Sequence, residues 1–266
     1  MGDRPREFAL NYGHPLAHGL VFAGLGRNSG STHYRDSSVY RNHGTLTNME
    51  PDTDWVWISE LGRWAIAPGG TNEAVIRAWT SYIAPPLTLA AWFLTSADGA
   101  SQDIVALYDN ASNDRWMSLN AGMNAAGDPV RAISYNATAA IATVGTITTN
   151  TWTHGVAAFT STVYRMAYKN GVAGSAETTS KDVTGVDEMG IGCTLAATAA
   201  RPLTGRIADA MVWNRILNDS EIALLADRSK AMLGGLILPP KRRLWSVPSA
   251  APPATTRAYV IGGGVI

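Results

Sequence analysis

Side chains that could act as acids or bases are scattered along this sequence. The nearest carboxylate clusters are Asp52 with Asp54 and Asp187 with Glu188, and both stand in turn-like sequence. A retaining glycosidase needs two carboxyl groups about 5 Å apart, which one strand supplies as acidic residues at alternate positions. The sequence has no such triplet. We therefore interpret these four residues as solvated loop charges and expect a chain that is not an enzyme.

Metal-binding and nucleophilic patterns are also missing. The five histidines show no HExxH or HxH spacing, which disfavours a zinc site. The single cysteine, Cys193, stands in apolar sequence and indicates a buried thiol. No GxSxG motif is present. His154 lies in a predicted strand beside Trp152, and we expect it to be a structural histidine.

The composition is typical of a folded protein that carries no net charge. The 266 residues carry 21 basic and 21 acidic side chains, and 46% of the residues are apolar. A net charge of zero gives no general attraction for nucleic acid or for an anionic membrane. There is no run of 18 apolar residues and no apolar stretch behind a basic start at Met1. We expect neither a membrane span nor a signal peptide.

Short β-prone segments separated by Gly, Asn, Asp and Thr fill most of the chain. Residues 163–169 alternate with a period of two, as in a half-covered strand. Asn170-Gly171 follows and predicts a type I′ hairpin. One helix is predicted from Asn218, the expected N-cap, to Gly234, with Glu221 completing a capping box. The predicted class is all-β with one late helix.

Five stretches, in this order, resemble the laminin-G-like and concanavalin A-like jelly-roll family. They are residues 19–22 (GLVF), 36–46 (DSSVYRNHGTL), 86–92 (PLTLAAW), 152–154 with 168–171 (WTH and YKNG), and 203–221 (LTGRIADAMVWNRILNDSE). The resemblance implies an antiparallel jelly-roll β-sandwich with one short C-terminal helix. We assign residues 1–17 to a lead segment, 18–235 to the jelly-roll domain, and 236–266 to an extended arm.

The same resemblance implies a metal position, because many relatives bind a structural calcium ion. The matching residues are Asp36, Asn42 and Asp209. The alternative is that Asp36 and Asn42 form Asx turns and that Asp209 is a hydrogen-bonding residue of the sheet. Val39 stands where the family usually has Gly, so the Asp36 loop cannot make the same positive-φ turn cheaply. We favour the turns and expect no other cofactor.

The nine tryptophans suggest a surface on which sugar rings could stack. Four of them, Trp64, Trp92, Trp152 and Trp213, match core positions of the family pattern. Four others are less constrained and could form a sugar platform or anchor an interface: Trp55, Trp57, Trp79 and Trp116.

Residues 236–266 differ in composition from the rest of the chain. They hold five of the 13 prolines and four basic side chains, with no acidic one. The run PPKRRLWSVP at residues 239–248 resembles tails that follow such domains in tailed-phage proteins. Three clustered charges are too few for a DNA-binding surface. We expect this arm to dock on protein through Lys241, Arg242, Arg243, Leu244, Trp245, Tyr259, Val260 and Ile261.

Two functions follow from these observations. The first is a non-enzymatic structural protein of a phage virion, a capsid decoration protein made in the host cytoplasm. Its partners would be a capsid lattice or copies of itself. The alternative is a carbohydrate-binding module for a cell-surface or extracellular glycan.

Overall fold

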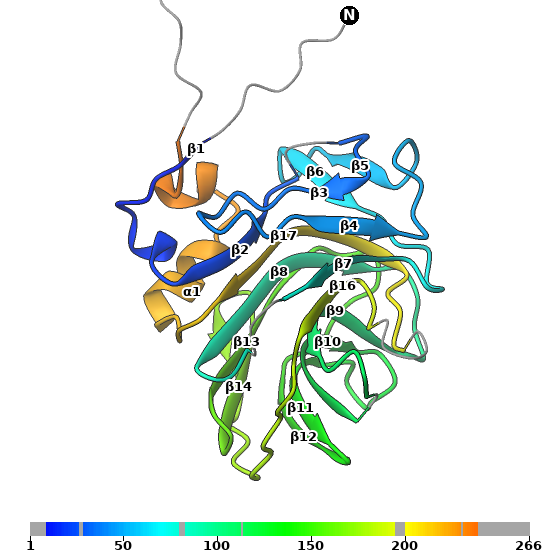
Figure 1. Cartoon of the computed structure of the whole chain (residues 1–266), viewed down its shortest axis with the longest axis vertical. Coiled ribbons are helices and arrows are strands. Elements are labelled where there is room, and N and C mark those ends of the chain that lie inside the picture. Colours follow the sequence, from blue (N-terminus) through cyan, green and yellow to red (C-terminus); the bar gives the residue numbers. More distant parts are fainter. Residues whose placement is uncertain are drawn as a thin grey trace, which may run out of the picture.

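The chain folds into two antiparallel sheets packed face to face (Figure 1). The computed structural model describes residues 9–26, 29–79, 83–112, 114–194, 200–229 and 231–238, without the side chains of 231 and 232. The predicted all-β sandwich is confirmed. Among the described residues, no helix is long and apolar enough to cross a bilayer.

Sheet I has eight strands and carries the candidate site. Its strands lie in the order β12 (Thr138–Val144), β11 (Val130–Asn136), β10 (Arg115–Gly122), β9 (Ser101–Tyr108), β16 (Glu188–Ile191), β7 (Ala74–Ala78), β4 (Gly44–Thr47) and β3 (His33–Tyr34). Along β10, Met117, Leu119 and Ala121 belong to the core between the sheets. Trp116 and Ser118 therefore point to the outer face, because strand side chains alternate.

Sheet II covers the other side of this core. Its strands lie in the order β15 (Val172–Ala173), β14 (Tyr164–Lys169), β13 (Thr153–Ser161), β8 (Leu87–Thr95), β17 (Gly205–Trp213), β6 (Arg63–Ile66) and β5 (Trp55–Ile58), and β2 (Leu20–Gly24) also pairs with β17. The predicted hairpin after Lys169 is present. Asn170 and Gly171 have φ values of 50° and 84°, the positive values that a type I′ turn requires.

Helix α1 (Asp219–Ala226) lies on the outer face of sheet II. The predicted capping box is present, since Asn218 and Glu221 each accept a hydrogen bond from the other's backbone N–H. The helix is shorter than predicted. The Asp227 side chain accepts hydrogen bonds from the Ser229 N–H and hydroxyl, a local turn that competes with helix. The short 3₁₀ helix η2 (Ala231–Gly235) follows.

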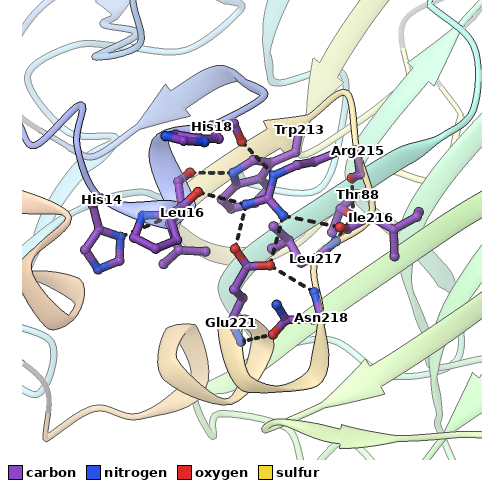
Figure 2. Close-up of polar contacts among 11 residues, drawn as sticks. His14, Leu16, His18, Thr88, Trp213, Arg215, Ile216, Leu217, Asn218 and Glu221 are labelled. Carbon is purple, nitrogen blue, oxygen red and sulfur yellow. Dashed lines mark hydrogen bonds and ion pairs between the residues drawn. The ribbon is translucent and has the colours of Figure 1, made fainter.

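Arg215 ties this helix to the N-terminal segment (Figure 2). Its guanidinium forms a bidentate pair with Glu221, with N···O distances of 2.7 and 2.9 Å. It also donates to the carbonyls of His18 and Pro15. Pro15 opens the 3₁₀ helix η1 (Pro15–Ala17), and the Trp213 indole donates to Leu16 beside it. The family-like NR…E sequence is thus a structural clamp.

The described body extends beyond both expected domain boundaries. Strand β1 (Ala9–Leu10) pairs with β18 (Ile237–Leu238) in a small third sheet. Leu10 and Leu16 lie in the same apolar cluster as Leu236, under α1. The division into lead, domain and arm stays a prediction, but residues 9–17 and 236–238 pack on the sandwich.

Candidate functional site

Asp36, the first of the expected calcium ligands, is a buried acceptor for protein donors. Its Oδ1 accepts hydrogen bonds from the N–H groups of Ala23 and Ser38, at 2.8 and 2.7 Å. Its Oδ2 accepts from the Ser38 hydroxyl and the Asn42 N–H, at 2.6 and 2.7 Å. The positive φ of this loop falls at Arg41, at 52°, so Val39 is not forced into it. The carboxylate is therefore fully used as an acceptor for N–H and O–H groups of its own loop and of β2.

The other two expected ligands have different partners. The Asn42 amide donates to the Val21 carbonyl and accepts from Arg77. Asp209 is buried at a bulge in β17 and pairs with Arg63. Burial raises the pKa of Asp209, and the Arg63 charge opposes that rise. Asp36 and Asn42 are thus brought together. Among the described residues, no three His, Cys, Asp or Glu side chains form a metal-binding group.

The four tryptophans of the expected sugar platform do not form one surface. Trp55 lies in the core and Trp79 is partly buried against it. Trp116 is 6% exposed, on the outer face of sheet I. Trp57 is 52% exposed, and its ring packs edge to face against Trp64 at 5.7 Å. Trp57, on β5, is the one of these four that is open to solvent.

Of the remaining residues singled out from the sequence, the structure describes Cys193 but not the docking residues of the arm. The expected docking residues, from Lys241 to Ile261, lie outside the described residues. Cys193 is buried, and burial followed by the nearby Asp103 charge raises the pKa of its thiol to about 11. Its thiol is therefore protonated at neutral pH and is a poor nucleophile.

An aromatic cluster occupies the outer face of sheet I. Trp116 on β10 and Tyr135 on β11 are paired across the strands. Their rings stack with centroids 5.0 Å apart and planes 5° from parallel. Ala106, Tyr108 and Ile133 complete the buried cluster, and Tyr135 and Ile141 pack against it while remaining partly exposed. Tyr135 and Ile141 thus carry the cluster to the surface.

A buried polar network fixes the segment that covers one side of this cluster. Asp103 on β9 accepts hydrogen bonds from the Asn120 amide, the Thr194 hydroxyl and Arg201 Nε, at 2.7 to 2.8 Å. The Arg201 guanidinium lies 3.8 Å from the centre of the Trp116 ring. Arg201 therefore combines an ion pair with a cation–π contact, and Trp116 is hidden beneath it.

A shallow cleft of about 620 Å³ opens on the same face, at the β11–β12 end of the sheet. Arg131, Ile141 and Thr143 line it from the strands, and Pro129 and Gly145 line it from the adjoining loops. Ile141 belongs both to this lining and to the margin of the aromatic cluster. The cleft and the cluster therefore form one continuous surface, which we call the cleft face.

Sequence reasoning located two strands of the cleft face, at residues 116–120 and 130–135, and missed β12 and the surface residues of the face. Residues 130–135 are β-prone, and Arg131, Ile133 and Tyr135 fall on one side of such a strand. Their alternation is a signal for a shared face. Which face points outward depends on the partner sheet, and this information is not local.

A smaller cleft of about 340 Å³ lies beside the Arg215 clamp. Its charged lining residues, Arg215 and Glu221, are paired with each other (Figure 2). Their hydrogen-bonding groups are used to join η1, β17 and α1. We therefore assign this cleft a structural role.

The family model described as the concanavalin A-like lectin/glucanases superfamily matches residues 68–223. This is more than half of the chain and includes all of β9 to β12. The chain belongs to this superfamily. A comparison of its sequence with curated proteins finds no significant match. Members of the superfamily share a fold, and that likeness does not by itself assign a function.

Solved structures with the same fold include sugar-binding domains. Domain 4 of AbnA, a GH43 extracellular arabinanase from Geobacillus stearothermophilus solved with arabinotriose, has a TM-score of 0.61 and 18% identity, over 77% of this chain and 100% of that one. The Ruminococcus gnavus IT-sialidase CBM40, bound to α2,3-sialyllactose, has a TM-score of 0.51 and 16% identity, over 61% and 96%.

Trypanosoma rangeli sialidase is also similar, with a TM-score of 0.56 and 16% identity. The match covers 81% of this concanavalin A-like chain and 33% of the sialidase. This chain therefore spans about a third of the sialidase. At these identities the likeness describes the fold alone.

Proposed function

We propose that this chain is a glycan-binding module that holds its ligand on the cleft face without cleaving it. The observation that carries the proposal is the continuity of the cleft with the Trp116–Tyr135 cluster through Ile141. Ligand sites are commonly concave and mostly apolar, with a few polar groups that fix orientation. Here the lining residues with polar side chains are Arg131, Thr143 and Thr146.

The chemistry of the cleft face suits a sugar. Aromatic rings offer apolar faces to the C–H groups of a pyranose, and hydroxyl and guanidinium groups hydrogen-bond to its oxygens. Arg131 and Tyr135 lie four residues apart on one face of β11. This spacing is about 13 Å, which leaves room for more than one sugar unit.

The carboxylates of this face support binding without hydrolysis. Asp103 is already paired with Asn120, Thr194 and Arg201. Glu188 pairs in register with Tyr108, five residues along β9 from Asp103, or about 16 Å. A glycosidase needs its two carboxyl groups within about 10 Å. These two residues are unsuited to act as such a pair.

A role in a phage particle stays a prediction. Its support lies in the composition of residues 236–266, and 239–266 are outside the described residues. The solved domains bound to arabinotriose and sialyllactose favour the glycan reading.

A glycan array followed by calorimetric titration of the best ligand tests the proposal. We expect Tyr135→Ala to weaken binding about tenfold or more, which corresponds to about 1.4 kcal/mol. Trp57→Ala, at the opposite edge of the sandwich, is the matched aromatic control and should bind like the wild type. Loss of binding in Trp57→Ala alone would move the site to β5. Failure to bind any glycan would refute the proposed function.

A further inference from the structure

Arg131 is the one charged residue among those that line the cleft. It is 9% exposed. Its Nη1 donates to the Asn124 side-chain oxygen at 3.1 Å. Among the described residues, no carboxylate lies within 4 Å of its guanidinium nitrogens. The Arg131 charge thus faces the cleft with a neutral partner.

The sheet leaves room for this guanidinium. A Cβ atom built on Gly122, the last residue of β10, would lie 2.3 Å from Arg131 Nε. Gly122 does not have a positive φ, so close approach explains the glycine better than backbone geometry does. The Arg131 side chain therefore lies across Gly122, and its position depends on the missing Cβ.

Arg201, on the same face, shows what a structural arginine looks like in this fold. Its Nε bonds to Asp103 and its guanidinium covers Trp116. Within the part of the chain that the structure describes, Arg131 has neither an acidic partner nor an aromatic one. Burial lowers the pKa of Arg131, which reflects the cost of removing its charge from water. An anion in the cleft would offset that cost.

We propose that Arg131 binds a carboxylate of the ligand and that the ligand is therefore an acidic glycan. This inference rests on the proposed function and names its substrate class. A guanidinium presents parallel N–H donors that match the two oxygens of a carboxylate. In Arg131, Nε and Nη2 have no bonded partner among the described residues, and they are the donors available for such a pair.

Matched glycans that differ only in the acidic group test the proposal by calorimetry on the full chain. The pairs are 3′-sialyllactose with its methyl ester, and oligogalacturonate with its methyl ester. We expect the acidic member of at least one pair to bind about tenfold to 100-fold more tightly, in line with a charge-assisted hydrogen bond. Equal affinity for both members of both pairs would overturn the inference and leave the proposed function standing. Absence of binding to any glycan of the array would instead refute the proposed function.

Three variants test whether the preference for the acidic glycan depends on the guanidinium group at position 131 or only on the overall positive charge of the protein. Arg131→Gln should abolish the preference for the acidic member, and Arg131→Lys should restore it only in part. Gly122→Ala keeps the charge but fills the space beneath the guanidinium, and it should also reduce the preference. Arg206→Gln, an exposed site on β17, removes the same charge elsewhere and should change nothing. A preference that survives Arg131→Gln in a folded protein would refute the role of Arg131.

Discussion

His154 is a titratable side chain buried on β13, with its ring 5.2 Å from the ring of Trp92. Burial lowers its pKa from 6.5 to about 3. The folded protein therefore keeps this imidazole neutral at pH values where the unfolded chain protonates it. The resulting stabilisation is complete above pH 6.5 and is lost as the pH falls toward 3.

Replacing His154 by Leu should flatten the dependence of stability on pH. Below pH 6.5 the wild type should lose up to about 1.4 kcal/mol of unfolding free energy per pH unit through this residue. Urea unfolding from pH 7.5 to 4.5 measures the slope. His33→Leu, at an exposed position, is the control. Equal slopes in the wild type and His154→Leu would show that His154 gains access to a proton without unfolding.

The Asp36 carboxylate leads to a prediction about calcium. Because both of its oxygens already accept hydrogen bonds from the loop and from Ala23 on β2, we expect millimolar Ca²⁺ to leave the melting temperature unchanged relative to EDTA. Asp36→Asn should cost about 2 to 4 kcal/mol of stability, because buried donors lose a charged acceptor. A rise of several degrees with Ca²⁺ that disappears in Asp36→Ala would contradict this prediction.

At the scale of elements, the Arg215 clamp is the contact that joins η1, β17 and α1 (Figure 2). The bidentate geometry with Glu221 requires the arginine fork, which a lysine cannot reproduce. Hydrogen bonding to Arg215, as the largest cause, lowers the pKa of Glu221. The pair therefore stabilises the protein above the usual glutamate pKa and loses this effect as the pH falls.

A double-mutant cycle with Arg215→Lys and Glu221→Gln should give a coupling energy of about 1 to 2 kcal/mol. Urea unfolding at neutral pH measures the four proteins of the cycle. Arg206→Lys, at an exposed position of β17, serves as the control. A coupling energy near zero would mean that Arg215 acts through its hydrogen bonds to backbone carbonyls and not through Glu221.

The same scale explains how much the sequence could predict. The Asn170–Gly171 turn and the Asn218–Glu221 capping box are set by neighbours in the chain, and both were predicted correctly. The proposed role of Arg131 could not be predicted in this way. It depends on Gly122, at the end of the neighbouring strand β10, and on the lack of a nearby carboxylate among the described residues. Trp116 was singled out from the sequence, but Arg201, distant in sequence, determines its burial.

At the scale of the whole molecule, the apolar layer outside sheet II joins the two ends of the described chain. Leu236 and Ile237 are 0% and 8% exposed and pack with Leu10 and Leu16. The packed body thus extends past residue 235, the expected end of the jelly-roll domain.

Two truncated chains measure how much residues 236–238 contribute to stability. A chain that stops after Leu238 should keep the unfolding free energy of the full chain. A chain that stops after Gly235 should lose about 3 to 6 kcal/mol, since burial of each of two large apolar side chains contributes about 1.5 to 3 kcal/mol. Chemical denaturation followed by circular dichroism compares them. Equal stability of the two truncated chains would show that β18 adds nothing to the body.

The pairing of β1 with β18 has a consequence for how the module can be carried. Ala9 and Leu238 are register partners in adjacent strands, so the chain enters and leaves the sandwich at one place (Figure 1). Paired residues of antiparallel strands lie about 5 Å apart, which is close to the gap that a tight surface turn bridges. The sandwich could therefore be inserted into a surface turn of a host protein. It would add a separate lobe, and the host residues on either side of the turn would stay close to each other.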